Sequence, residues 1–170
     1  MVQANPVSRE MSILLTSIAL LPNPAKKNKS VTNILTMMIT RQICHIDTQF
    51  EAPRNATTAH LIAQHGTPAQ LAQVLELGPN LEITDAFGYT VMHYACLGGN
   101  KGCFDLLAER AEDLGLDVDA ASEGGVTCLM AAIRSRSALV VAAVLEQSAN
   151  PFYKDCVGKD AVDYAKAMRD

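Results

Sequence analysis

The stretch DAFGYTVMHYACLGG, residues 85–99, decides the fold of this chain. It joins a turn that contains Gly88 to Thr90, and small and apolar residues follow. His93 stands three residues after Thr90, with Cys96 close behind. The stretch is either a site that performs chemistry or a structural unit that the chain repeats, and the rest of the sequence distinguishes the two.

Aligning the chain on this threonine reveals four copies of the unit. They are TTAHLIAQHG from Thr57, TVMHYACLGG from Thr90, TCLMAAIRSR from Thr127 and DAVDYAKAMR from Asp160. The spacings between these anchor positions are 33, 37 and 33 residues. Such a period indicates a repeat architecture, in which units stack because one unit alone cannot bury its apolar face.

Positions on both sides of the anchor also agree between the copies. Three residues after the anchor stand His60, His93, Met130 and Asp163. Two residues before it stand Asn55, Gly88, Gly125 and Gly158. In the first three copies an aliphatic run then leads to a Gly or Ser and an Asn or Asp, which is typical of a helix followed by a turn.

These units resemble ankyrin repeats, whose pattern is D-x-x-G-x-T-P-L-H-x-A-A-x-x-G, followed by an aliphatic helix and G-A-D/N. Six positions of the pattern are present in residues 85–99, as Asp85, Gly88, Thr90, His93, Ala95 and Gly99. The usual proline is replaced by Val91, Cys128 and Ala161, and the first unit lacks both the turn glycine and the aspartate. The resemblance covers about residues 51–170, in units near 52–84, 85–121, 122–154 and 155–170.

The resemblance implies an all-α fold, an α-solenoid of helix-turn-helix repeats with hairpin-like turns. The composition agrees, because a chain with 49% apolar and only 5% aromatic residues builds its core from small and aliphatic side chains. Four additional residues in the second unit fall in ERAEDLGLD, residues 109–117, and we expect them to lengthen its second helix by one turn. The family assigns structural roles to the repeated positions Thr57, His60, Gly88, Thr90, His93, Gly125, Thr127 and Gly158.

Residues 1–50 precede the repeats as an extension in which two short amphipathic helices are predicted. Apolar side chains recur at helical steps over residues 11–21 and again over residues 31–46. The first run is far shorter than the ~20 residues that span a bilayer, so no transmembrane helix is expected. The extension either packs on the repeats or on a partner, or it is a mitochondrial presequence or a secretory signal.

Charge and cysteine content limit the classes of partner and the compartment. Residues 1–50 carry five basic and two acidic side chains, whereas residues 51–170 carry nine and sixteen. An acidic main body does not favour nucleic-acid binding, which needs clustered Lys and Arg. The five cysteines are an odd number without a C-x-x-C pair, which indicates a reducing compartment. We expect an intracellular, cytoplasmic protein, with a mitochondrial location as the alternative.

The candidates for a metal site are His93, Cys96 and Cys103, and the candidates for catalysis are His60 and His93. Structural zinc needs four ligands with paired short spacings, and no second pair follows these three. A catalytic histidine needs a nucleophile or a carboxylate beside it, so an enzyme is an alternative only if these side chains are exposed and clustered. We therefore expect a structural histidine, no metal and no cofactor.

The sequence favours a noncatalytic protein-binding module or scaffold. In ankyrin repeats the turn tips and the outward positions of the first helices form a concave face. Six residues are predicted to bind a partner there, with the aromatics as exposed anchors: Phe87, Tyr89, Tyr94, Leu97, Arg134 and Arg136.

The fourth unit is predicted to contain one helix, so its open end and the front helices are predicted to dock on other chains in a larger assembly. The alternative is a mitochondrial or membrane-associated complex subunit that is anchored by its N-terminal helices.

Overall fold

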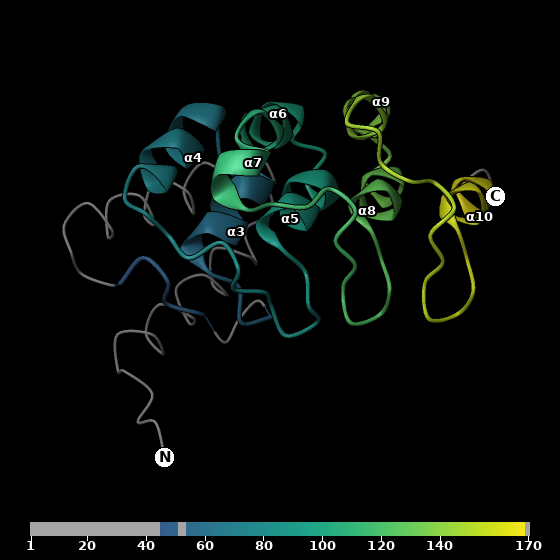
Figure 1. Ribbon diagram of the computed structural model, residues 1–170, viewed down its shortest axis with the longest axis horizontal. Helices are drawn as coiled ribbons and strands as arrows, with labels where there is room; N and C mark the ends of the chain where they lie inside the picture. Colours follow the sequence, from purple (N-terminus) through teal and green to yellow (C-terminus); the bar gives the residue numbers. More distant parts are fainter. Residues whose placement is uncertain (1–44, 51–53, 169–170) are drawn as a thin grey trace, which may run out of the picture.

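The computed structural model describes residues 45–50 and 54–168. The helix predicted over residues 11–21 and nearly all of the one predicted over 31–46 lie outside the described residues. Within the described part the secondary structure is helical, apart from two isolated antiparallel bridges, Phe50 with Ala56 and Ala121 with Thr127. The helices follow one another as stacked pairs along the long axis of the molecule, so the prediction of an all-α repeat fold is confirmed (Figure 1).

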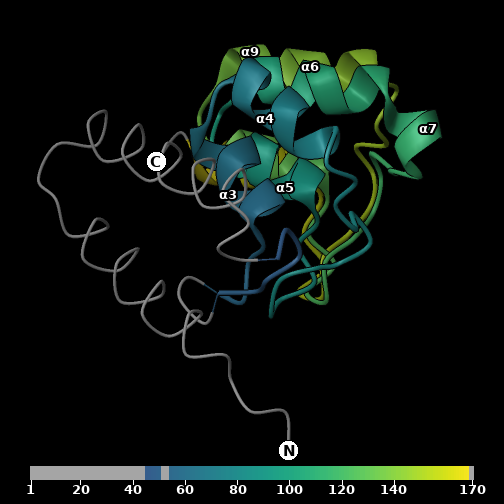
Figure 2. The same ribbon diagram turned by 90° about the vertical axis from the view of Figure 1, so that its left-hand side faces the viewer.

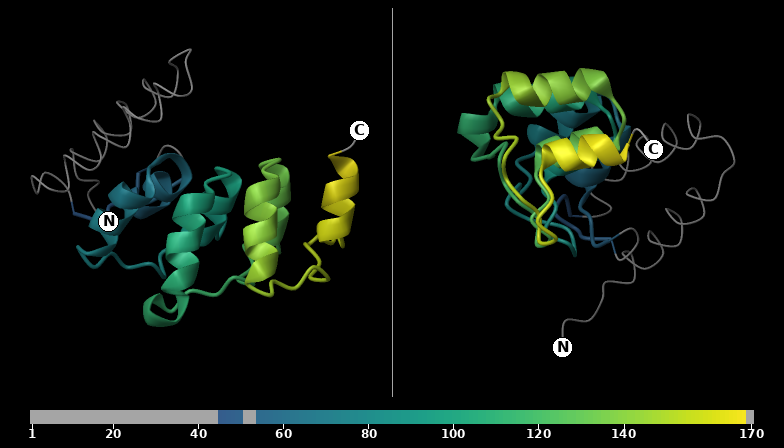
Figure 3. Two further views of the ribbon diagram at one scale, coloured as in Figure 1. Left: turned by 90° about the horizontal axis from the view of Figure 1, so that it is seen from above. Right: turned by 90° about the vertical axis from the view of Figure 1, so that its right-hand side faces the viewer.

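The helices form two layers. The first layer contains the first helix of each unit: α3 (Thr58–His65), α5 (Val91–Leu97), α8 (Cys128–Arg134) and α10 (Ala161–Ala167). The second layer contains α4 (Pro68–Leu75), α6 (Lys101–Glu109) and α9 (Ala138–Glu146). Each second-layer helix packs on the first helix of its own unit, and helices of one layer pack on their neighbours in that layer. Figure 2 shows the two layers end-on, and Figure 3 shows the stacking order from above.

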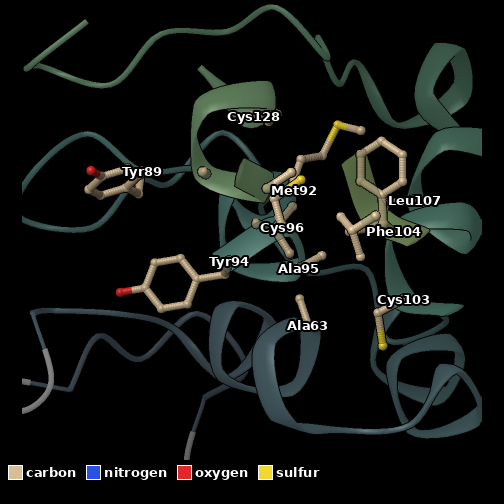
Figure 4. Packing of buried hydrophobic residues seen from close by; sticks show 14 of the residues in the cluster. Ala63, Tyr89, Met92, Tyr94, Ala95, Cys96, Cys103, Phe104, Leu107 and Cys128 are labelled. Carbon is tan, nitrogen blue, oxygen red and sulfur yellow. The ribbon is translucent and has the colours of Figure 1, made fainter. Parts of the chain in front are cut away.

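The two layers bury different shares of their surface. In α5 every residue from Val91 to Cys96 is buried, because the helix contacts α3, α8 and its partner α6. The second-layer helices bury one stripe each: Leu71, Val74 and Leu75 in α4, Cys103, Phe104 and Leu107 in α6, and Val140, Ala143 and Val144 in α9. Small side chains such as Ala95 and Cys96 let the layers approach closely around Met92 (Figure 4).

Hydrogen-bonded hairpins precede the first helices and extend from the same side of the stack (Figure 1). Backbone hydrogen bonds join each hairpin to the next. The N–H of Ala86 donates to the carbonyl of Arg54 (2.8 Å), the N–H of Glu123 donates to the carbonyl of Phe87 (3.0 Å), and the N–H of Cys156 donates to the carbonyl of Gly124 (2.9 Å). The hairpins therefore form a continuous ladder that runs across the units.

Two glycines make the close contact between hairpins possible. Gly88 and Gly125 have φ angles of +76° and +73°, which L side chains rarely adopt. A Cβ atom at Gly88 would also lie 2.7 Å from the backbone nitrogen of Glu123. The first unit has no glycine at this position and instead places Asn55 at a φ of 56°, which an asparagine tolerates better than most residues.

The predicted lengthening of the second unit's second helix is wrong. Helix α6 ends at Glu109, and Arg110 has φ −109° and ψ 11°, outside the helical region. The additional residues form a separate short helix, α7 (Ala111–Leu114), which ends at Gly115 with a φ of 64°. The break has a physical reason, because it allows apolar side chains of the inserted segment, among them Leu114, to pack against the core.

The first unit includes residues that precede position 51. Phe50 is fully buried, and its N–H donates to the carbonyl of Ala56 at 3.0 Å. In the second unit the equivalent bond runs from the N–H of Asp85 to the carbonyl of Tyr89. The hairpin of the first unit is therefore two residues longer than that of the second.

None of the helices in residues 45–50 and 54–168 combines the length and the apolar character that a membrane crossing requires.

Replacing Gly88 by alanine is expected to lower the free energy of unfolding by roughly 2–4 kcal/mol, because it adds a collision with the next hairpin to the cost of a positive φ. Gly158→Ala is the matched control, since Gly158 has a φ of +82° but no atom within 4 Å of the position of a Cβ. It is expected to cost about 1–2 kcal/mol. Urea unfolding of the full chain measures both, and equal losses would contradict the role of the hairpin contact.

Candidate functional site

The histidine three residues after the anchor connects two units. The backbone N–H of Thr90 donates to Nδ1 of His93 (3.3 Å), and the Thr90 hydroxyl lies 2.9 Å from the same nitrogen. On the other side of the ring, Nε2 lies 2.9 Å from the backbone carbonyl oxygen of Val126 in the next unit. Because Nδ1 accepts from an N–H, Nε2 carries the proton and donates it to this carbonyl.

His60 makes the same set of contacts one unit earlier. Its Nδ1 accepts from the N–H of Thr57 (3.3 Å) and lies 2.8 Å from the Thr57 hydroxyl, while Nε2 lies 3.2 Å from the carbonyl oxygen of Tyr89. Burial lowers the pKa of His60 to about 4, so the ring is neutral at neutral pH. Both histidines thus act as capping residues of their own helix and as bridges to the following hairpin.

The candidate metal-binding and catalytic residues are used in packing. His93 and Cys96 are fully buried, and the Sγ atom of Cys103 lies 3.9 Å from the carbonyl oxygens of Ile62 and Gly66. Burial raises the pKa of the Cys103 thiol to about 11 and that of Cys96 well above its usual value. Within the described residues, no three His, Cys, Asp or Glu side chains are grouped so that they could hold a metal ion. The condition that these residues be exposed, on which the enzyme alternative depended, is not met.

An aspartate–tyrosine pair that the sequence reasoning missed stabilises the second hairpin. One carboxylate oxygen of Asp85 accepts from the N–H groups of Phe87 (2.8 Å) and Tyr89 (2.9 Å), and the other accepts from the hydroxyl of Tyr94 (2.9 Å). Asp155 and Tyr164 form the same pair in the fourth unit, at 2.8 Å. The signal in the sequence is an Asp followed nine residues later by a Tyr, at the same register in both units.

The prediction that Tyr89 and Tyr94 are exposed is wrong, since they are only 7% and 3% exposed. The Tyr94 ring packs edge-on against His60, and the Tyr89 ring packs edge-on against His93. Burial and the adjacent Asp85 carboxylate raise the pKa of Tyr94, which keeps its hydroxyl protonated as a donor. In Figure 4 both tyrosine hydroxyls point away from the aliphatic core around Leu107.

The other four predicted binding residues lie at the surface to different extents. Phe87 is 50% exposed at a hairpin tip, and the guanidinium carbon of Arg54 lies 4.7 Å from the centre of its ring. Leu97 is half-buried near the end of α5, and Arg134 is exposed as the last residue of α8. Arg136 is also exposed, in the turn after α8, where it has a φ of 60°.

Four of the six predicted residues line one hollow of about 310 Å³: Tyr89, Tyr94, Leu97 and Arg134. Arg54 and Gln64 also line it. The lining residues come from the hairpins and from the first-layer helices α3, α5 and α8, whose surface away from the second layer we call the concave face. A second hollow, of about 280 Å³, shares Arg134 and continues toward Tyr164 on α10. Phe87 and Arg136 line neither of the two.

Stacked helix-turn-helix units joined by a ladder of hairpins define an α-solenoid. The family model described as ankyrin repeats, in 3 copies, matches residues 59–155, which is more than half of the chain. The protein therefore belongs to the ankyrin-repeat family, whose members generally mediate protein–protein interactions and are typically not enzymes. No curated protein matches the sequence.

The stability of the fold is expected to fall by about 2 kcal/mol between pH 7 and pH 5 through His60 alone. In the unfolded chain this residue gains a proton below its ordinary pKa of 6.5, whereas the buried ring resists protonation until about pH 4, so acid favours unfolding over that interval. Urea unfolding at the two pH values measures the loss. An NMR titration of the folded chain is the direct control, and a His60 midpoint at 6.5 would contradict the assignment.

Proposed function

We propose that this chain is a noncatalytic protein-binding module that takes its partner on the concave face and the hairpin tips. The observation that carries the proposal is the hollow that brings Tyr89, Tyr94, Leu97 and Arg134 together across neighbouring units. The general role of ankyrin repeats in protein–protein interaction supports it. So does the use of the buried histidines for capping and bridging, because it leaves them unsuited to proton transfer.

Contacts inside the repeats hold the floor of this hollow in place. The hydroxyl of Tyr94 is bonded to Asp85, and its ring is packed against His60. Phe87 lies outside the hollow at the hairpin tip, where it is half exposed and where Arg54, which does line the hollow, lies over its ring. A surface that does not need to be ordered on binding loses less free energy on association, which favours recognition of a partner by the outer edges of these side chains.

We further propose that the protein is a small subunit or scaffold of a larger assembly. The support comes from large apolar side chains that are exposed at the end of the third unit, Phe152 (75%) and Tyr153 (47%), and in the fourth unit, Val157 (74%) and Val162 (49%). In the second and third units, the hairpin and the first helix are covered by the unit that follows. Exposed apolar side chains at such a density are a feature of surfaces that bind other proteins. The free cysteines support an intracellular, cytoplasmic location.

Site-specific photo-crosslinking tests both parts of this proposal. A photoreactive amino acid is placed in the full chain at Leu97 on the concave face, at Val162 on the last unit, or at Leu139, which is 68% exposed on the second-layer helix α9. Irradiation in the producing cells, followed by mass spectrometry, is expected to give protein adducts at Leu97 and at Val162.

Leu139 is the matched control, because it is apolar and exposed but lies in the other layer. Adducts at Leu139 without adducts at Leu97 would contradict binding on the concave face. A chain without adducts at Val162 would contradict the docking of its last unit in an assembly.

A further inference from the structure

We propose that the protein segment bound on the concave face carries an acidic side chain, whose carboxylate binds between Arg54 and Arg134. This inference rests on the proposed function and specifies the chemistry of the partner. Its basis is a pair of arginines that line the same hollow and that come from different units.

The two arginines reach the hollow from different parts of the fold. Arg54 belongs to the hairpin of the first unit, and each hairpin leads into the N-terminal end of a first-layer helix. Arg134 is the last residue of α8 and therefore lies at the far end of that layer. A segment that crosses the hollow from the hairpins toward the helix ends passes both guanidinium groups.

Neither arginine has an acidic partner among the described residues. The ion pairs found in this part of the chain join His45 to Asp47, Lys101 to Asp105, and Lys166 to Asp163. Asp85, the carboxylate next to the hollow, already accepts hydrogen bonds from Tyr94 and from two backbone N–H groups. Both arginines are exposed, so two positive charges stay available on a protein with a net charge of −4.

The position of Arg54 and the chemistry of the arginine side chain favour a bound carboxylate. The guanidinium carbon of Arg54 lies 4.7 Å from the ring centre of Phe87 and 5.7 Å from that of Tyr89, which restricts its motion. Arg134 is exposed at the end of α8, so its guanidinium group is accessible to a ligand. An arginine presents a planar fork of donors that matches the two oxygens of a carboxylate, and such paired, charge-assisted bonds are among the strongest in proteins.

The repeat register places Arg134 at the centre of a longer groove. Tyr164 in the second hollow stands four residues after its anchor, as Tyr94 does in the first. Arg134 lines both hollows. The second hollow also contains Asp155 and Asp163, so an acidic ligand group is favoured in the first hollow and disfavoured in the second.

The charge of the chain's own N-terminal extension argues against it as the occupant. Residues 1–50 carry five basic and two acidic side chains, a balance that two arginines repel. A segment of another protein with Asp or Glu satisfies the charge of the hollow.

Selection from a displayed library of random peptides on the full-length chain tests this inference. Selected peptides that bind on the concave face are expected to be enriched in Asp or Glu. Their dissociation constants, from fluorescence anisotropy, are expected to rise about 10- to 100-fold in Arg134→Gln, because a charge-assisted bidentate pair is lost. Arg54→Gln is expected to act in the same direction.

Arg136→Gln is the matched control, since it removes the same charge two residues away at an exposed position outside both hollows. It is expected to change the affinity less than about twofold, because surface charges contribute little over that distance. Replacing the peptide's Glu by Gln is expected to abolish the difference between the Arg134 variant and the unmodified chain. Circular dichroism checks that each variant is folded.

The outcomes separate this inference from the proposed function. Two results would overturn the inference and leave the proposed function standing. In the first, the selected peptides crosslink at Leu97 but contain no acidic residue. In the second, they lose equal affinity in Arg134→Gln and in Arg136→Gln. Peptides that crosslink at Leu139 and not at Leu97 would contradict both.

Discussion

The hydrogen bond from a histidine ring to a backbone carbonyl of the next unit is the contact on which the rest of the structure depends. His60 donates to Tyr89 and His93 donates to Val126, and each acceptor directly precedes the threonine that begins the next first-layer helix. Each histidine therefore positions the start of the following unit as well as capping its own helix. This geometry sets the stacking and the hairpin register at the first two junctions, whereas Met130 takes the histidine's position at the third.

The scaffold and the proposed binding surface share residues, so contacts inside the repeats hold that surface in place. Tyr94 connects a hairpin to its helix through Asp85, and an edge of the same side chain lines the larger hollow. The hairpin ladder, which Gly88 makes possible, brings Arg54 near Phe87 and Tyr89. The positions that a partner meets are thus determined by contacts inside the repeats.

Periodicity predicted the repeats, because Thr90, His93 and Gly88 recur for reasons that are local to one unit: a cap, a capping partner and a positive φ. The burial of Tyr94 could not be predicted from this periodicity, because it depends on packing against His60 in the preceding unit and on a hydrogen bond to Asp85, nine residues earlier. The separate helix α7 likewise depends on contacts with the core, and the number of inserted residues does not reveal these contacts. The hollow combined four predicted residues with Arg54, which no single-unit pattern singles out.

The tautomeric state of the two bridging histidines tests the account most directly. Long-range ¹H–¹⁵N NMR correlation of the full chain at pH 8 distinguishes a ring nitrogen that carries a proton from one that does not. The account predicts that Nε2 carries a proton and Nδ1 does not in both His60 and His93, as their bonds to the backbone require, and that the Nε2–H protons exchange slowly with water. A proton on Nδ1, or Nε2–H protons that exchange as fast as those of an exposed histidine, would contradict the bridge between units.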